Sequence, residues 1–482
     1  MLLEEVKARF SEEKPDEQVV DLLLQIEQNK NRRKFVVLDD DPTGIQTVHD
    51  VSVYTDWSVD SIIQGFMEKN SLFYLLTNSR ALTDNQTTKL HLELTSNVIH
   101  AAEKTRKEFM IISRSDSTLR GHYPLETELV KQVVENKTRT VIDGEILCPF
   151  FKEGGRYTVD NVHYVDEAGT LIPAGESEFA KDKTFGYRSS NLCDYIEEKT
   201  DGDYRAEDTI SISLESLRKM EIDNITAQLC LVGDFTKIVV NAIDYIDIKV
   251  FCIALFRAMA AGRNFMFRCA ASFVKVLGGI SDRPLLTREE MVKEKVTTGG
   301  MIVIGSHTKK TTNQMEQLKG IKNLEFIQFN SDLVLDETAF EVEISRVVQQ
   351  SEATIRKGWT VVVYTKRTLL TLEGDTKEEA LLRSVKISEA VCQLVGRLRV
   401  TPRFVLAKGG ITASDIGVKA LMVKQARVLG QICPGIPVWE TNARSKFPGI
   451  PFIIFPGNVG GKMTLKEAVE ILLDEQEVKI YE

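Results

Sequence analysis

Three consecutive carboxylates follow an apolar run near the start of the chain, in the stretch VVLDDDPTGIQT at residues 36–47. Asp39, Asp40 and Asp41 repel one another, so the end of a strand is a poor place for them unless cationic groups meet them there. The Pro-Thr-Gly that follows them predicts a turn. The sequence therefore favours a binding or catalytic site at this point of the chain.

Cationic and hydroxyl groups follow a second apolar run, in the stretch SRSDSTLRG at residues 113–121. Guanidinium groups such as those of Arg114 and Arg120 bind carboxylates through paired hydrogen bonds, and hydroxyls beside a carboxylate can hold a polyol. Together these groups suit a small hydroxy acid. The alternative is a helix N-cap formed by Asp116 or Ser117, with the arginines in solvent.

Two further candidates are weaker when each is taken alone. Arg80, in LLTNSRAL, follows another apolar run and could bind a ligand or form a surface ion pair. His163 lies in CPFFKEGGRYTVDNVHYV, where Gly154 and Gly155 permit a close approach of the backbone. This histidine could contact a ligand or could support the loop through its own hydrogen bonds, which is the commoner situation.

Three segments of the second half combine glycines or hydroxyls with the end of an apolar run: VIGSHTKKTTNQ, VLAKGGITASDIG and FPGNVGGKMT. Unsatisfied N–H groups at such turns and at helix N-termini favour phosphate. The third segment is not a Walker motif, because Pro456 stands where glycine is needed and Met463 where serine or threonine is needed. Three such segments in one region predict a nucleotide across the edge of a sheet.

The elements that must position these residues follow from the alternation of apolar and polar segments. Short runs rich in Val, Ile and Phe alternate with polar segments of helical period, which predicts an α/β fold with mainly parallel sheets flanked by helices. In such sheets ligands bind at the carboxyl ends of the strands, where the candidate residues stand. The chain of 482 residues is too long for one core, and the polar stretch at 278–299 predicts a connection between two domains.

Composition excludes several classes of function. A net charge of -9 argues against a nucleic-acid-binding protein, so an anionic ligand would need local cationic partners. Seven scattered cysteines without a CxxC pair indicate neither a zinc site nor a disulfide framework. The acidic, amphipathic N-terminus does not resemble a signal peptide, and Arg257 interrupts the most apolar window. We therefore expect a cytoplasmic protein without membrane partners.

The segments DDDPTG, SDSTLRG, GRYTVDNVHYV, KGGITASD and PGNVGG, in this order, resemble the four-carbon acid sugar kinase family from about residue 35 to residue 470. The resemblance implies an N-terminal domain that binds a tetronate-type acid sugar, a C-terminal domain that binds ATP, and an active site in the cleft between them. We expect a helical extension at 1–34, the substrate domain at 35–285 and the nucleotide domain at 286–482.

The resemblance also implies roles for individual residues. Asp40 and Asp116 are expected to be catalytic, and strand alternation favours Asp40 at the sugar with Asp41 as its structural partner. The expected substrate-binding residues are Asp41, Ser117 and Arg120 from the family motifs, together with Arg80, Arg114 and His163 from the candidates described above. The expected nucleotide-binding residues are Ser306, Thr312, Gly409, Gly410, Thr412, Gly457, Asn458, Gly460 and Gly461.

The expected activity is ATP-dependent phosphorylation of a hydroxyl of threonate, erythronate or 3-oxo-tetronate. Phosphoryl transfer implies Mg²⁺, carried on the nucleotide phosphates, although no spacing identifies its protein ligands. We expect the acid sugar and ATP as partners, and a homo-oligomer, namely a dimer. Departures from the family pattern at Asp39 and Pro42 leave the particular acid sugar open.

Two other functions are compatible with parts of the sequence. An NAD-linked hydroxy-acid dehydrogenase would need a GxGxxG segment after an early strand, and none is present. A non-catalytic acid-sugar sensor would be expected to carry a basic helix-turn-helix, and it would have no use for two phosphate-type glycine clusters.

Overall fold

The computed structural model describes residues 2–10, 15–293, 296–368, 370, 372, 375–457 and 459–473. The chain forms two compact units: unit 1 comprises Met1–Val48 and Asp56–Asp282, and unit 2 comprises His49–Thr55 and Arg283–Glu482. Each unit has a mainly parallel sheet with flanking helices, so the predicted α/β fold is confirmed. The structure divides the chain at 282/283 where we expected 285/286, and it assigns residues 49–55 to unit 2, which the sequence did not indicate.

Unit 1 is built on a fully parallel sheet with the strand order β3-β1-β4-β11-β5-β10-β9. Its strands are β1 (Lys34–Asp39), β3 (Leu72–Leu76), β4 (Phe109–Arg114), β5 (Gly144–Cys148), β9 (Ile210–Ile212), β10 (Thr236–Val240) and β11 (Phe265–Cys269). Every residue of β1, β3, β5 and β11 is buried. These strands therefore need apolar residues on both faces, which explains the continuous apolar runs.

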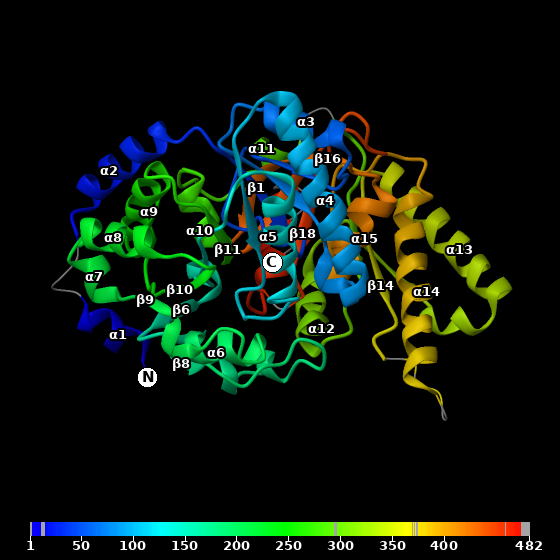
Figure 1. Ribbon diagram of the computed structural model, residues 1–482. Helices are drawn as coiled ribbons and strands as arrows, with labels where there is room; N and C mark the ends of the chain where they lie inside the picture. The colour runs from blue at the N-terminus through cyan, green and yellow to red at the C-terminus, as the bar shows by residue number, and fades with distance from the viewer. Residues whose placement is uncertain are drawn as a thin grey trace. The chain divides into compact units, whose positions relative to one another are not determined.

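The helices of unit 1 form two packed groups. One group contains α3 (Val59–Met67), α4 (Asp84–Thr105) and α5 (Leu125–Lys137), with α4 in contact with both of the others. The other contains α2 (Glu17–Lys30), α7 (Leu214–Arg218), α8 (Ile222–Leu231), α9 (Tyr245–Ala260) and α10 (Ala271–Leu277), all in contact with α9 (Figure 1). The most apolar window of the chain is thus α9, and its Arg257 pairs with Glu27 and Asp223. No helix in the described ranges is long and apolar enough to cross a membrane.

A small antiparallel sheet that the sequence did not indicate follows β5. It consists of β6 (Arg156–Val159), β7 (Val162–Glu167) and β8 (Thr170–Pro173), and α6 (Leu192–Lys199) comes after it. The short helix α1 (Leu3–Arg9) meets this sheet through the bridge between Leu2 and Thr170. The segment GRYTVDNVHYV therefore forms a hairpin rather than a long loop.

Unit 2 contains a mixed sheet with the strand order β13-β14-β12-β15-β18-β17-β16-β2. The parallel strands are β12 (Met301–Ile304), β13 (Leu324–Phe329), β14 (Thr360–Thr365), β15 (Val405–Lys408) and β18 (Pro451–Phe455). The antiparallel strands are β17 (Ile436–Thr441), β16 (Gln425–Cys433) and β2 (Ser52–Tyr54). The edge strand β2 comes from the early part of the chain, which is why residues 49–55 belong to this unit.

The helices of unit 2 are α11 (Arg288–Met291), α12 (Lys309–Glu316), α13 (Glu337–Arg356), α14 (Lys377–Gly396), α15 (Gly410–Asp415) and α16 (Thr464–Leu472). A π-helix, η8 (Ile416–Ala420), continues α15. An apolar core of this unit joins residues of β12, β15, β17 and β18 to α16, among them Ile302, Leu406, Ile453 and Leu465. The helix α11 is the element that interrupts the polar connection predicted at 278–299.

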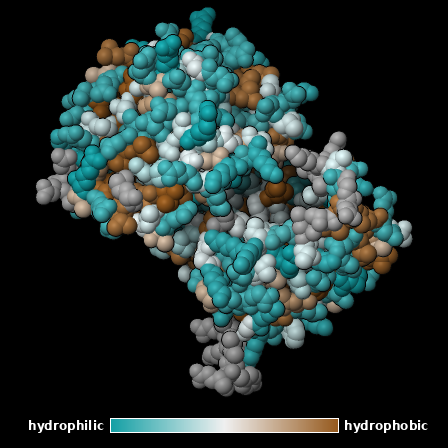
Figure 2. Space-filling view, turned by 90° about the horizontal axis from the view of Figure 1, so that it is seen from below, coloured by the Kyte–Doolittle hydropathy of each residue, from teal (hydrophilic) through white to brown (hydrophobic). Residues whose placement is uncertain are grey.

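Hydrophobic residues are scattered on the surface. On the face seen in Figure 2 they form separate small groups within a largely hydrophilic surface. Such isolated exposed hydrophobic residues are normal in folded proteins. The seven cysteines are all free.

Candidate functional site

The strand order of each unit reverses direction beside its first parallel strand. In unit 1 the chain passes from β1 to β3 on one side and then returns to β4 on the other side. In unit 2 the chain passes from β12 to β13 and β14 on one side and then to β15 on the other. Ligands of open α/β sheets bind beyond the carboxyl ends of strands at such points. The predicted residues follow β1 and β4 in unit 1, and β12 and β15 in unit 2.

The carboxylates after β1 have different surroundings. Asp39 accepts a hydrogen bond from Arg114 Nη1 at 3.1 Å, and Asp41 accepts hydrogen bonds from the backbone N–H and the hydroxyl of Thr43 at 2.8 and 2.6 Å. The turn packs closely, because a Cβ atom on Gly44 would lie 2.0 Å from Asp39 Oδ1. The segment Pro-Thr-Gly therefore forms the predicted turn, which brings Gly44 against the Asp39 carboxylate.

Arginines from two neighbouring strand ends meet these carboxylates. Arg80, which follows β3, contacts Asp41 and lies 3.3 Å from Asp116 Oδ1 and 3.9 Å from Asp40 Oδ1. Arg114, the last residue of β4, lies 3.7 Å from Asp40 Oδ1 in addition to its bond with Asp39. The mutual repulsion of the aspartates is thus offset by buried guanidinium groups.

The segment after β4 is a turn, and no helix begins at Asp116 or Ser117, so the capping alternative is wrong. Asp116 accepts hydrogen bonds from the Thr118 hydroxyl and from Arg120 Nε, the latter at 2.7 Å. Arg120 also lies 3.7 Å from Asp182, and its guanidinium carbon is 5.1 Å from the centre of the Phe179 ring. Arg120 is therefore held by carboxylates and an aromatic ring of its own domain.

The four aspartates of this site fall into two pairs, one with raised and one with lowered pKa values, because burial and nearby charges act on them to different extents. Burial raises the pKa of Asp39 to about 7 and that of Asp40 to about 6, against the opposing effect of nearby arginines. Burial also opposes ionisation of Asp41 and Asp116. The charge of Arg80 acts together with hydrogen bonds from Thr43 at Asp41, and together with Arg120 and Thr118 at Asp116. These combined effects outweigh burial and hold both pKa values below the usual range.

Asp40 differs from the other three aspartates in its hydrogen bonds. It is 2% exposed, and neither carboxylate oxygen has a hydrogen-bond partner in the described part of the chain. Arg268, near the end of β11, faces it: a Cβ atom on Gly121 would lie 3.4 Å from both Arg268 Nη2 and Asp40 Oδ2. A buried acceptor without a donor is costly, so Asp40 is suited to receive a donor from a ligand.

Ser117 and His163 support the turn. His163 is fully buried, its Nδ1 lies 3.0 Å from the Thr158 hydroxyl, and its Nε2 lies 2.8 Å from the Ser117 carbonyl oxygen. Burial lowers its pKa to about 4, so it is neutral near pH 7. These bonds argue against the expected ligand role of His163, because both ring nitrogens join the β6–β7 hairpin to the turn after β4.

Residues predicted to bind the nucleotide converge at the carboxyl edge of unit 2. A Cβ atom on Gly409, whose φ is +125°, would lie 3.3 Å from Thr412 Oγ1 and 3.6 Å from Ser306 Cβ. Thr308 caps α12 and lies 3.3 Å from the Ser306 hydroxyl, and Thr311 donates to that hydroxyl at 3.1 Å. The loops after β12 and β15 thus form one surface of hydroxyls and backbone N–H groups.

The loop after β18 joins this surface. Lys408 Nζ donates to the carbonyl oxygens of Pro456 at 2.7 Å and Gly457 at 3.3 Å, and Gln314 of α12 donates to that of Gly461 at 2.8 Å. Burial lowers the pKa of Lys408 to about 7. Gly460, with a φ of +81°, lies in the same turn, Gly410 begins α15, and Asn458 lies outside the described residues.

Arg367 is a residue of this edge that the sequence analysis missed. It follows β14, donates to the carbonyl oxygen of Ser306, and donates from Nε and Nη2 to the Thr312 hydroxyl at 3.2 and 2.9 Å. Its Nη1 is buried and has no hydrogen-bond partner within the described ranges. A basic residue directly after a strand beside β12 was the signal that could have identified it.

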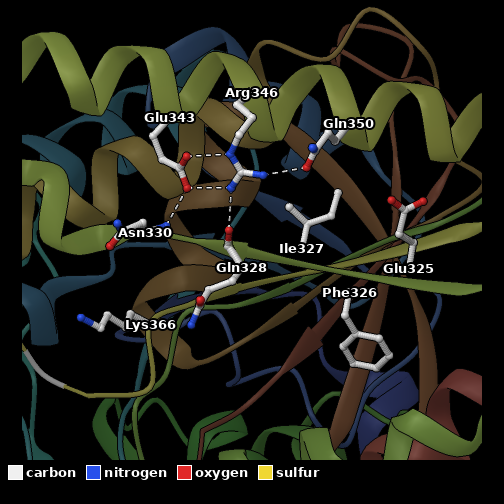
Figure 3. A pocket seen from close by; sticks show the side chains of 9 residues that line it. All are labelled: Glu325, Phe326, Ile327, Gln328, Asn330, Glu343, Arg346, Gln350 and Lys366. Carbon is white, nitrogen blue, oxygen red and sulfur yellow. Dashed lines mark hydrogen bonds and ion pairs between the residues drawn. The ribbon is translucent and has the colours of Figure 1, made fainter.

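A hollow of about 490 Å³ elsewhere in unit 2 does not contain the predicted residues. It lies beside the edge strand β13 and is lined by residues of β13 and α13, together with Asn330 and Lys366 (Figure 3). Its central cation, Arg346, donates two hydrogen bonds to Glu343, one to Gln350 and one to the Gln328 carbonyl oxygen, as the dashed lines show. Four of the five N–H groups of Arg346 therefore already have partners in the protein.

No group of three or more His, Cys, Asp or Glu side chains in the described part of the chain has an arrangement that could hold a metal ion.

Two domain families match the chain. Residues 35–277 match the sugar-binding N-terminal domain, and residues 301–465 match the nucleotide-binding C-terminal domain. No curated protein matches the sequence.

Solved structures share the fold at low sequence identity. HI1011 of Haemophilus influenzae, of the DUF1537 family, is 16% identical with a TM-score of 0.59, and the match covers 91% of this chain and 100% of that one. A Salmonella typhimurium LT2 protein, provisionally described as a tRNA synthase, is 13% identical with a TM-score of 0.64, and the match covers 92% of this chain and 100% of that one. At these identities the likeness concerns the fold alone.

Proposed function

Because the chain belongs to the four-carbon acid sugar kinase family, we propose that it is an ATP-dependent kinase acting on a hydroxyl of a small acid sugar such as threonate, erythronate or 3-oxo-tetronate. Unit 1 binds the acid sugar in this proposal, and unit 2 binds ATP. Transfer requires the hydroxyl held by unit 1 to reach the γ-phosphate held by unit 2.

The observation that carries this proposal is the state of the Asp40 carboxylate. Its buried oxygen atoms have no hydrogen-bond donor in the described part of the chain, and a substrate hydroxyl would supply one. The hydroxyl loses its proton as its oxygen attacks phosphorus, and a carboxylate with a pKa of about 6 is ionised at neutral pH and can accept that proton. Asp116, whose pKa is well below the usual range, remains ionised and orients the neighbouring groups.

The carboxyl edge of unit 2 supports the nucleotide part of the proposal. Ser306, Thr312 and Thr412 supply hydroxyls, Gly409 and Gly457 leave the backbone accessible, and Arg367 supplies a cation with a free N–H group. Mg²⁺ commonly keeps several waters and is bound by one or two carboxylates together with nucleotide phosphates. We propose that it enters this site with ATP and neutralises phosphate charge there.

A panel of four-carbon acid sugars tests the proposal. ADP release with each acid, measured against ATP alone, identifies the substrate, and phosphorus NMR locates the phosphate on the product. We expect release with at least one acid of the panel. Release that never exceeds the ATP-only baseline would contradict the kinase function, and a change in reduced-nicotinamide absorbance with the same acids would indicate a dehydrogenase.

A further inference from the structure

Five arginines surround the carboxyl edge of unit 1, and they differ in whether a carboxylate neutralises them. Arg80, Arg114 and Arg120 each have at least one aspartate oxygen within 4.0 Å. Arg156 and Arg268 have no carboxylate within that distance in the described part of the chain. A ligand carboxylate could bind to the first three only by competing with an existing ion pair, so the last two are the candidates for an unshared charge.

Arg268 already has partners at this edge. Its Nη2 donates to the Arg120 carbonyl oxygen at 2.8 Å, and it faces the Asp40 carboxylate across Gly121. Its charge opposes the burial that raises the pKa of Asp40. One N–H group of Arg268 is therefore committed to the backbone of the turn, and its charge acts on Asp40 without a hydrogen bond among the described residues.

Arg156, the first residue of β6, has one edge of its guanidinium group free. Nη1 donates to the carbonyl oxygens of Gly154 and Gly155, whereas Nε and Nη2 donate no hydrogen bond within the described ranges. The Nε atom is buried and has no hydrogen-bond partner among the described residues. Nε and Nη2 form the edge of the guanidinium plane that can bind both oxygens of one carboxylate.

The surroundings of Arg156 connect it to the substrate residues. Its guanidinium carbon lies 5.4 Å from the centre of the Phe179 ring, the same ring that Arg120 contacts at 5.1 Å. Arg120 is bonded to Asp116, and Arg80 lies between Asp116 and Asp40. The free donor edge of Arg156 and the free acceptor oxygens of Asp40 thus belong to one connected set of side chains.

We propose that Arg156 binds the carboxylate of the acid sugar through Nε and Nη2, and that this contact selects acids over neutral polyols. The inference rests on the proposed kinase function. In this proposal Arg156 binds the carboxylate of the substrate, and Asp40 accepts a hydrogen bond from one of its hydroxyls. The backbone bonds from Nη1 hold the guanidinium plane in place before the substrate arrives.

The test compares the acid sugar that the wild-type protein phosphorylates with the neutral polyol of the same carbon skeleton. Arg156→Gln removes the charge, and Arg156→Lys keeps the charge without the paired donors. A hydrogen bond to a charged group is worth about 10- to 150-fold in affinity, so we expect Arg156→Gln to raise KM for the acid by about that factor. KM for ATP and activity on the polyol should stay unchanged, so the preference for the acid disappears.

Arg188→Gln is the matched control, because that side chain of unit 1 is 90% exposed. It should leave both KM values unchanged. Melting temperatures identify variants that fail to fold, and if Arg156→Gln fails, Arg156→Lys decides: a smaller rise of KM for the acid supports the role, and an unchanged KM refutes it.

The two levels of the proposal fail in different ways. A wild-type protein that phosphorylates an acid sugar, with a folded Arg156→Gln that retains the full preference for the acid, overturns the role of Arg156 and leaves the kinase function standing. A wild-type protein that phosphorylates no acid sugar overturns the kinase function and this inference together.

Discussion

At the carboxyl edge of unit 1, aspartates and arginines neutralise one another, whereas at the carboxyl edge of unit 2 glycines, hydroxyls and a few cations line the strand ends. Both edges lie where the strand order reverses, so the topology is similar and the chemistry differs. In unit 1 the ligand must find the few donors and acceptors that the ion pairs leave free. In unit 2 the ligand meets backbone N–H groups that remain accessible because glycine has no side chain to cover them. A hydroxy acid suits the first edge, and a phosphate chain suits the second.

Among the substitutions that test this difference between the two edges, Asp40→Asn should have the largest effect on activity. We expect Asp40→Asn to reduce turnover by about 10²- to 10⁴-fold, because the attacking hydroxyl loses its proton acceptor. KM for ATP should be nearly unchanged, since the proposed ATP site lies in unit 2. Steady-state kinetics with both substrates varied gives the two values.

Asp41→Asn is the control for Asp40. The Asp41 carboxylate is bonded to Thr43 and Arg80, so its loss should lower the melting temperature more than the turnover. Full activity in Asp40→Asn would refute the assignment, and a loss of turnover confined to Asp41→Asn would reverse the two roles.

Arg367 provides the corresponding test for unit 2. If its free Nη1 meets a phosphate, Arg367→Gln should raise KM for ATP by about 10- to 150-fold and leave KM for the acid sugar unchanged. Arg346→Gln is the control, since four of the five N–H groups of Arg346 are occupied by Glu343, Gln350 and Gln328. Equal effects of Arg367→Gln on both substrates would argue against separate binding edges.

The pH dependence of the reaction should report the pKa of Asp40. Burial raises this pKa to about 6, so the carboxylate becomes protonated, and unable to accept a proton, as the pH falls through that value. We expect kcat/KM for the acid sugar to decrease about tenfold between pH 7 and pH 5. A profile that remains flat down to pH 5, with the protein still folded by circular dichroism, would exclude Asp40 as the base.

The smallest effects are expected for substitutions of two glycines by alanine, one at each edge. The two substitutions should differ in whether they lower the melting temperature. Gly44→Ala places a methyl group against the Asp39 carboxylate, and overpacking of this kind costs about 1–3 kcal/mol, which should lower the melting temperature by several degrees. Gly457→Ala meets no atom of the described residues within 4 Å. It should leave the melting temperature unchanged and weaken ATP binding, which calorimetry with ATP can measure.

The sequence predicted the parts of the fold that depend on local patterns. The apolar runs at β1, β3, β4, β12 and β15 each became a buried strand followed by the expected polar residues, because a strand covered on both faces needs a continuous apolar run. The strands β6, β7 and β8 were missed, since each is short and includes residues that are not buried, and their hairpin turns resemble a loop. The placement of β2 depends on a partner strand far away in the sequence and has no local signal.

The candidate site was predictable where residues directly follow a strand. Asp40, Arg80 and Asp116 come together because β3, β1 and β4 are neighbours in the sheet. Arg268 and Arg367 were missed, although they stand at the ends of strands too. Arg268 is a single arginine within an apolar run, and Arg367 follows its strand without the glycines that marked the other candidates. The bonds that argue against a ligand role of His163 were not predictable, because no pattern in the sequence shows that the Thr158 hydroxyl and the Ser117 carbonyl oxygen occupy its ring nitrogens.

The strand β2 has a consequence for the synthesis of this protein in the cell. Tyr54 bonds with Gln425 of β16, 371 residues later in the chain, so the ribosome releases β2 long before its partner exists. At roughly 5–20 residues per second, the wait is on the order of 20–70 seconds. During that time β2 must remain without β16, although the residues of unit 1 on both sides of it, up to 48 and from 56 onward, have already been synthesised. A gene fragment that begins at residue 283 would encode a sheet that lacks its edge strand.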